Sequence, residues 1–123
     1  MNVVDSSGWL EYFSGSDRAE RYAAAIEDTD NLVVPVVCIY EVFKKICQAQ
    51  GQAAAEIRMA DLMKGQVVDL TASLAMSAAL LSIAHHLPMA DSLILATARE
   101  HQAILWTQDE HFKGLDGVQF IEK

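Results

Sequence analysis

Four acidic residues stand where a predicted strand ends or a predicted helix begins, and they are Asp5, Glu41, Asp91 and Asp109. In parallel α/β sheets, the carboxyl ends of the strands and the amino ends of the following helices meet at one edge, where ligands bind. We therefore expect these four carboxylates to lie close together at one edge of a sheet.

Clustered carboxylates repel one another, by roughly 4 kcal/mol for two charges about 4 Å apart at an intermediate dielectric constant. A bound divalent cation removes this conflict. Oxygen ligands without paired cysteines or histidines favour Mg²⁺ or Mn²⁺ over zinc. The chemistry suited to such a site is metal-assisted hydrolysis of phosphodiesters by an activated water.

Each acid taken alone has a simpler explanation. An aspartate at the start of a helix is ordinarily a cap that also complements the helix dipole, which applies to Asp5, Asp91 and Asp109. Glu41 has Lys44 and Lys45 at helical spacing and is expected to pair with one of them. Only the common edge of the four acids favours the metal site over these alternatives.

Strand and helix patterns alternate along the whole chain. Strands are expected at about residues 1–4, 32–34, 67–68, 103–106 and 118–121, with helices between most of them. The connections are long enough for crossovers, so the prediction is a three-layer α/β/α sandwich with a mainly parallel central sheet. One domain is expected to cover residues 1–123. The most apolar segment, 72–87, is predicted to be a buried helix.

The composition is 52% hydrophobic, and the formal net charge is −8. This charge argues against non-specific binding to polyanions or anionic membranes, so a nucleic-acid partner would need positive charge from another source, such as the metal. The N-terminus lacks the basic and apolar regions of a secretion signal, and segment 72–87 is shorter than the ~20 residues that span a bilayer. We expect a cytoplasmic protein without membrane contact.

The sequence resembles the PIN-domain family, and within it the VapC-like toxins of toxin–antitoxin pairs. Nearly the whole chain takes part, through Val4–Ser7, Pro35–Glu41, Pro88–Ala98 and Leu105–Phe112. The first motif is weak alone. The last two segments are specific when taken together, because Pro-x-Ala-Asp-x-x-Ile-x-Ala-x-Ala is followed closely by Thr-x-Asp-x-x-Phe. The resemblance implies a Rossmann-like sandwich and a Mg²⁺- or Mn²⁺-dependent endoribonuclease that cleaves RNA, usually a homodimer held inactive by a cognate antitoxin.

The resemblance also assigns roles to individual residues. It makes the four acids catalytic, and it makes Asp5, Asp91 and Asp109 the metal ligands. Ser6 matches the small polar residue beside the first acid, and Thr107 matches the hydroxyl that supports the fourth. Gln108 departs from the family pattern, since many relatives carry a basic side chain there.

Two alternative functions that differ from a toxin nuclease stay open for a fold of this kind. A catalytically inactive PIN-like module for RNA binding or assembly would be expected to lack one or more of the acids, whereas a housekeeping RNA-processing nuclease would keep them but have no antitoxin. His111 is either a surface residue or close enough to Asp109 to touch substrate. The available phosphate contacts are Arg18, Arg21, Lys44, Lys45 and Arg99, each of which is otherwise a solvated surface charge.

Overall fold

The computed structural model describes residues 1–123 and contains one five-stranded sheet, with strand order β3-β2-β1-β4-β5. The strands are β1 (Asn2–Val4), β2 (Leu32–Pro35), β3 (Gln66–Val68), β4 (Ile104–Thr107) and β5 (Val118–Phe120). Every neighbouring pair is parallel. The sheet is thus entirely parallel, which agrees with the predicted architecture.

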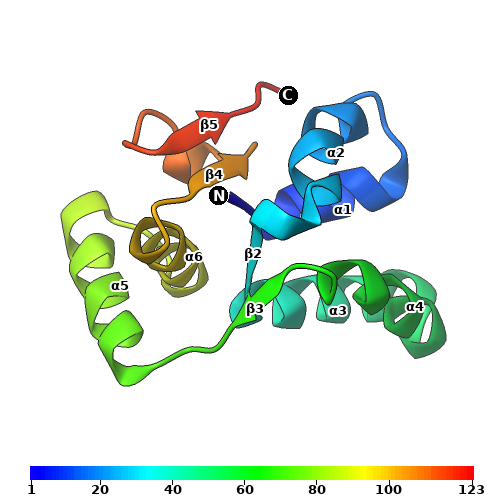
Figure 1. Cartoon of the computed structure of the whole chain (residues 1–123), viewed down its shortest axis with the longest axis horizontal. Coiled ribbons are helices and arrows are strands. Elements are labelled where there is room, and N and C mark those ends of the chain that lie inside the picture. Colours follow the sequence, from blue (N-terminus) through cyan, green and yellow to red (C-terminus); the bar gives the residue numbers. More distant parts are fainter.

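Six α-helices cover the two faces of this sheet (Figure 1). One face carries α1 (Ser6–Ser14), α2 (Ala19–Glu27), α3 (Val36–Gln50) and α4 (Gln52–Leu62). The other carries α6 (Met89–Glu100), with α5 (Ala72–His85) packed on the outer side of α6. Two 3₁₀ turns, η1 (Thr29–Asn31) and η2 (Glu110–Phe112), complete the chain. The predicted three-layer sandwich is confirmed.

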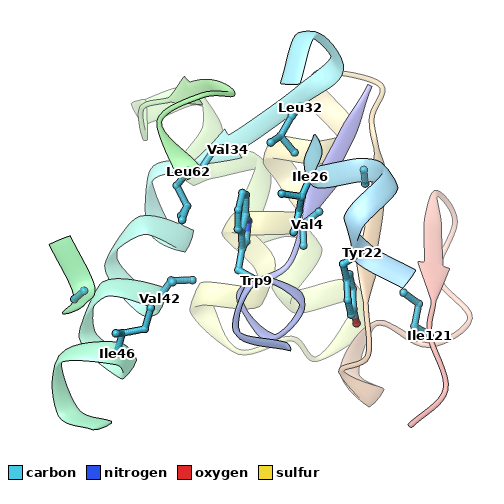
Figure 2. Close-up of a cluster of buried hydrophobic side chains, with 12 residues drawn as sticks. Val4, Trp9, Tyr22, Ile26, Leu32, Val34, Val42, Ile46, Leu62 and Ile121 are labelled. Carbon is cyan, nitrogen blue, oxygen red and sulfur yellow. The ribbon is translucent and has the colours of Figure 1, made fainter. Parts of the chain in front are cut away.

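The strands divide their side chains between two apolar cores, because successive residues of a strand point to opposite faces. Val4 and Val34 face α1–α4, whereas Val3 and Val33 face α6. Trp9 of α1 is fully buried in the first core, and Figure 2 shows its ring between the side chains of the sheet and those of α3 and α4. This packing fixes α1 directly behind the end of β1.

Gly8 allows α1 to approach its neighbours closely. A Cβ atom at this position would lie 2.6 Å from the ring of Tyr22 and 2.7 Å from Val4 Cγ1. Any larger residue would therefore push α1 away from α2 and β1.

The prediction that segment 72–87 is a buried helix is wrong for much of α5. Only Leu74 and Ala78 are buried along the helix, whereas Met76, Leu80 and Ile83 are 65%, 69% and 74% exposed. The helix packs on α6 along one side, and no element of this chain covers its outer face. No single helix is long and apolar enough to cross a membrane; α5 and α6 pass that test only as a pair, bent by 114°.

The order of the strands creates a crevice at one edge of the sheet. From β1 the chain moves outward through β2 to β3, then returns to the other side of β1 to form β4 and β5. A parallel sheet opens at such a reversal, outside the carboxyl ends of the strands, and ligands bind there. In this fold the reversal lies between β1, which ends before Asp5, and β4, which ends before Gln108.

Candidate active site

All four predicted acids line one open cavity at this edge, with a volume of about 440 Å³. Asp5 follows β1 and Asp109 lies just beyond β4, while Glu41 comes from the second turn of α3 and Asp91 from the first turn of α6. The remaining lining residues are mostly polar and are Ser6, Ser7, Leu10, Tyr40, Lys44, Lys45 and Gln48. The fold thus brings together the carboxylates that the sequence places at strand and helix ends.

Asp5 is the most buried of the four acids, with only 3% of its surface exposed. Its Oδ1 accepts a hydrogen bond from the Ser6 amide at 2.8 Å, so Asp5 is also the N-cap of α1. Its Oδ2 accepts from the hydroxyls of Ser7 and Thr107, both at 2.9 Å. Burial raises the pKa of Asp5 from 3.8 to about 6, because these hydrogen bonds do not fully compensate for lost hydration.

Glu41 is held by the chain segment next to Asp5. The Ser6 hydroxyl donates to Glu41 Oε1 at 2.7 Å, which ties α1 to α3 across the cavity. Glu41 forms no ion pair with Lys44 or Lys45, although both lie at helical spacing from it. The expected surface pairing is therefore not observed, and the carboxylate belongs to the cavity instead.

Asp91 and Asp109 share a third group, the imidazole of His111. His111 Nδ1 lies 2.9 Å from Asp91 Oδ2 and 3.2 Å from Asp109 Oδ1, and one ligand atom from each of the three residues lies within 4.8 Å of the others. Asp91 makes no capping bond to its own helix, so a capping role does not explain it. Asp109 does cap η2 by accepting from the His111 amide.

The electrostatics of this group reflect crowded negative charge. Burial, followed by repulsion from Asp109, raises the pKa of Asp91 above its usual range. The charge of Asp109, followed by the hydrogen bond to Asp91, raises the pKa of His111. A positive charge on His111 would partly neutralise the two carboxylates. This partly buried and mutually repelling set of oxygen donors fits a divalent ion, because the ion would relieve the desolvation and the repulsion together.

The sequence matches the PIN domain family over residues 3–118. The chain belongs to this family. No curated protein sequence matches the chain. Among solved structures, this PIN domain is similar to a toxin–antitoxin complex from Klebsiella pneumoniae, with a TM-score of 0.83 at 23% identity and complete coverage of both chains.

Two further structures share the fold of this PIN domain. VapC20 of Mycobacterium tuberculosis, a toxin that cleaves the Sarcin-Ricin loop, superimposes with a TM-score of 0.78 at 20% identity, covering 100% of this chain and 98% of that one. VapBC2 of Rickettsia felis, bound to a DNA fragment from its promoter, gives 0.75 at 12% identity, with coverage of 98% and 97%. The TM-scores establish a common fold.

Thr107 has a wider role in this PIN domain than the resemblance implies. Its hydroxyl donates to Asp5 Oδ2 and accepts from the Asp109 amide at 3.0 Å. It therefore fixes the first acid as well as the backbone of the fourth. Gln108 does not point to the cavity, because its Oε1 accepts from the Tyr22 hydroxyl at 3.2 Å in the buried interior. A missing basic side chain at 108 thus says nothing about how the cavity contacts its substrate.

The sequence alone does not decide whether His111 is a surface residue or lies close enough to Asp109 to touch substrate. Its position two residues after Asp109 indicates that it lies near this acid. The spacing does not show that η2 turns the imidazole ring back toward Asp91. The structure places the ring against Asp91 and Asp109, while the side chain is 54% exposed and is not among the residues that line the cavity, so contact with substrate stays a prediction.

Proposed function

We propose that this PIN domain is a Mg²⁺- or Mn²⁺-dependent endoribonuclease and the toxin of a toxin–antitoxin pair. The observation that carries the proposal is the convergence of Asp5, Glu41, Asp91 and Asp109 on one cavity, in a fold shared with VapC toxins. An inactive binding module would not need to hold four carboxylates against their mutual repulsion.

Asp5, Asp91 and Asp109 would hold the ion, and Glu41 would complete the acidic quartet. Carboxylate oxygens favour Mg²⁺ or Mn²⁺. When bound, such an ion stabilises the charge on a phosphodiester and lowers the pKa of a bound water. The exclusion of Asp5 from solvent supports this assignment, because an ionised Asp5 is far less costly beside a cation than alone.

The surrounding hydroxyls keep the acids in place before substrate arrives. Ser6 links the first turn of α1 to Glu41, and Thr107 links Asp5 to the backbone of Asp109. Positioning the carboxylates in advance avoids reorganisation during the reaction. Ser6 and Thr107 are therefore proposed as supporting residues rather than as groups that touch the scissile bond.

We also propose a homodimer formed through α5. Segment 72–84 contains no charged residue, and its outer face exposes Met76, Leu80 and Ile83. An apolar face of this kind marks an interaction surface, and a second copy is its simplest occupant because it supplies an equally uncharged helix. On the rest of the surface, the net charge of −8 opposes self-association.

The cognate antitoxin is the proposed regulatory partner, and the proposed compartment is the cytoplasm. Support for the antitoxin comes from the fold shared with the toxin–antitoxin complexes of Klebsiella pneumoniae and Rickettsia felis. A short reading frame for a DNA-binding protein beside this gene would favour the toxin over a housekeeping nuclease.

The function is tested by incubating the protein with a mixed RNA pool in Mg²⁺, in Mn²⁺ and in chelator. Wild type should cleave with either ion and stop with chelator, and Asp5→Asn and Asp91→Asn should lose cleavage. Asp69→Asn is the matched control, because Asp69 follows β3 at the same sheet edge but does not line the cavity. Cleavage that survives chelation or the Asp91→Asn substitution would overturn the proposal.

A further inference from the structure

The acidic cavity has one wall of opposite charge. Five residues on successive turns of α3 line the cavity, namely Tyr40, Glu41, Lys44, Lys45 and Gln48. From Glu41 to Gln48 the helix rises about 10 Å, at about 1.5 Å per residue. The wall therefore leads away from the acids over a length that matches one or two nucleotides rather than a single ion.

Lys44 and Lys45 are the only lysines or arginines among the residues that line the cavity. The protein has nine lysines and arginines. Five of the other seven are engaged by a carboxylate or a backbone carbonyl: Arg18, Arg21, Lys64, Arg99 and Lys113. Neither Lys44 nor Lys45 forms an ion pair, even with the neighbouring Glu41, which accepts from Ser6 instead.

Tyr40 adds an aromatic surface to the same wall. It is 63% exposed, and no other aromatic side chain is found among the exposed large hydrophobic residues. The Lys44 ammonium lies 5.6 Å from the centre of its ring. An exposed aromatic ring beside a cation without an ion pair is a combination that binds single-stranded nucleic acid, where the ring stacks on a base and the cation contacts the phosphate.

We propose that Tyr40, Lys44 and Lys45 position single-stranded RNA next to the cleavage site, with a base stacked on Tyr40 and the adjoining phosphates at the two lysines. The assignment rests on the proposed function, and it names the part of the cavity that grips the substrate. It also gives a route by which a protein of net charge −8 approaches a polyanion, because the positive charge within the cavity lies on one wall, beside the acids. The three residues are positioning residues, since the reaction itself is assigned to the acids.

The test measures RNA binding separately from cleavage. A fluorescently labelled single-stranded RNA of mixed sequence is titrated with full-length Asp91→Asn protein in Mg²⁺, and anisotropy gives Kd at several salt concentrations. In this background, Lys44→Gln/Lys45→Gln is compared with Lys64→Gln/Lys123→Gln, which removes the same charge outside the cavity. Tyr40→Ala is compared with Tyr40→Phe, which keeps the ring.

We expect Lys44→Gln/Lys45→Gln to raise Kd at least about ten-fold and to reduce the slope of log Kd against log salt by about 1.4, at about 0.7 for each phosphate contact. Tyr40→Ala should raise Kd about 5- to 100-fold, and Tyr40→Phe should bind as the parent does. The control pair should leave both Kd and the slope near their parent values.

Equal weakening by the two lysine pairs would overturn the inference, because bulk charge would then explain the binding. Unchanged RNA binding in all wall variants would overturn it as well, while cleavage by the wild type in Mg²⁺ would leave the proposed function standing. An acidic peptide that binds the parent through Tyr40 and Lys44, with RNA binding unaffected by the same variants, would assign the wall to a protein partner instead. A wild type that neither binds nor cleaves RNA would refute the proposed function itself.

Discussion

Replacing Asp5 with asparagine should stabilise the metal-free protein at neutral pH, although it removes a residue proposed as essential for activity. Asp5 is 3% exposed and accepts three hydrogen bonds, yet its pKa is raised from 3.8 to about 6. Above pH 6 the fold therefore holds an ionised carboxylate that would be better hydrated in the unfolded chain. Asparagine has nearly the shape of the protonated acid and carries no charge.

The size of the effect follows from the two pKa values. One pKa unit corresponds to about 1.36 kcal/mol, so ionised Asp5 costs the metal-free fold about 3 kcal/mol. Because the pKa is higher in the folded state, this cost is absent below pH 3.8, grows as the pH rises, and is complete above about pH 6. The asparagine amide can donate to the hydroxyls of Ser7 and Thr107, which also accept, so little hydrogen bonding is lost.

The assay is urea unfolding in chelator across this pH range, followed by the fluorescence of the buried Trp9. Asp5→Asn should exceed wild type by about 3 kcal/mol above about pH 7 and match it near pH 4. The exposed Asp69→Asn should show no such difference at either pH. Added Mg²⁺ should stabilise the wild type, by about 2.7 kcal/mol at one hundred times Kd, and should stabilise Asp5→Asn much less.

Two results would refute this reasoning. If Asp5→Asn were no more stable than wild type at any pH, the carboxylate would not be paying a desolvation penalty, and its burial would no longer argue for a cation. If Mg²⁺ stabilised both proteins equally, Asp5 would not contribute to the ion's site.

Three other substitutions test separate parts of the structure. Gly8→Ala should lower the free energy of unfolding by about 1–3 kcal/mol in urea, because its Cβ would overlap a tyrosine ring; an unchanged value would contradict that packing. Thr107→Val should cost about 1–3 kcal/mol and also slow RNA cleavage, since it removes the donor to Asp5; full activity would exclude the supporting role. Ile83→Asp should convert a dimer to a monomer in sedimentation velocity, whereas the equally exposed Ile57→Asp on α4 should not, and a wild type that sediments as a monomer would refute the α5 interface.

The sequence allowed the sheet and its helices to be predicted because both depend on short-range pattern. Short β-branched runs at residues 2–4 and 32–35 are strands in the structure, and the long connections between strands left only a parallel sheet. The meeting of Asp5 and Asp109 follows from the same rule, since both come after neighbouring strands. Asp69 shows the limit of this rule. It also follows a strand, but β3 lies too far from the crevice between β1 and β4 for Asp69 to line the cavity.

Features that depend on tertiary packing could not be predicted in this way. The direction of Gln108 is set by Tyr22, which is 86 residues away in the chain, and no local pattern reveals that partner. The contact between His111 and Asp91 likewise depends on how η2 packs against α6. The apolar composition of α5 indicates that it needs a partner surface, but composition does not tell a core from an interface with another chain.

The central claim is that the acidic quartet binds a divalent ion and that RNA cleavage depends on that ion. Mn²⁺ binding, followed by the loss of the free-ion signal in electron paramagnetic resonance, and RNA cleavage should be measured on the same samples of wild type, Asp91→Asn and Asp69→Asn. We predict that Asp91→Asn loses binding and cleavage together, while Asp69→Asn retains both. Cleavage at the wild-type rate by Asp91→Asn, or by wild type without Mn²⁺ or any other divalent ion, would contradict the claim.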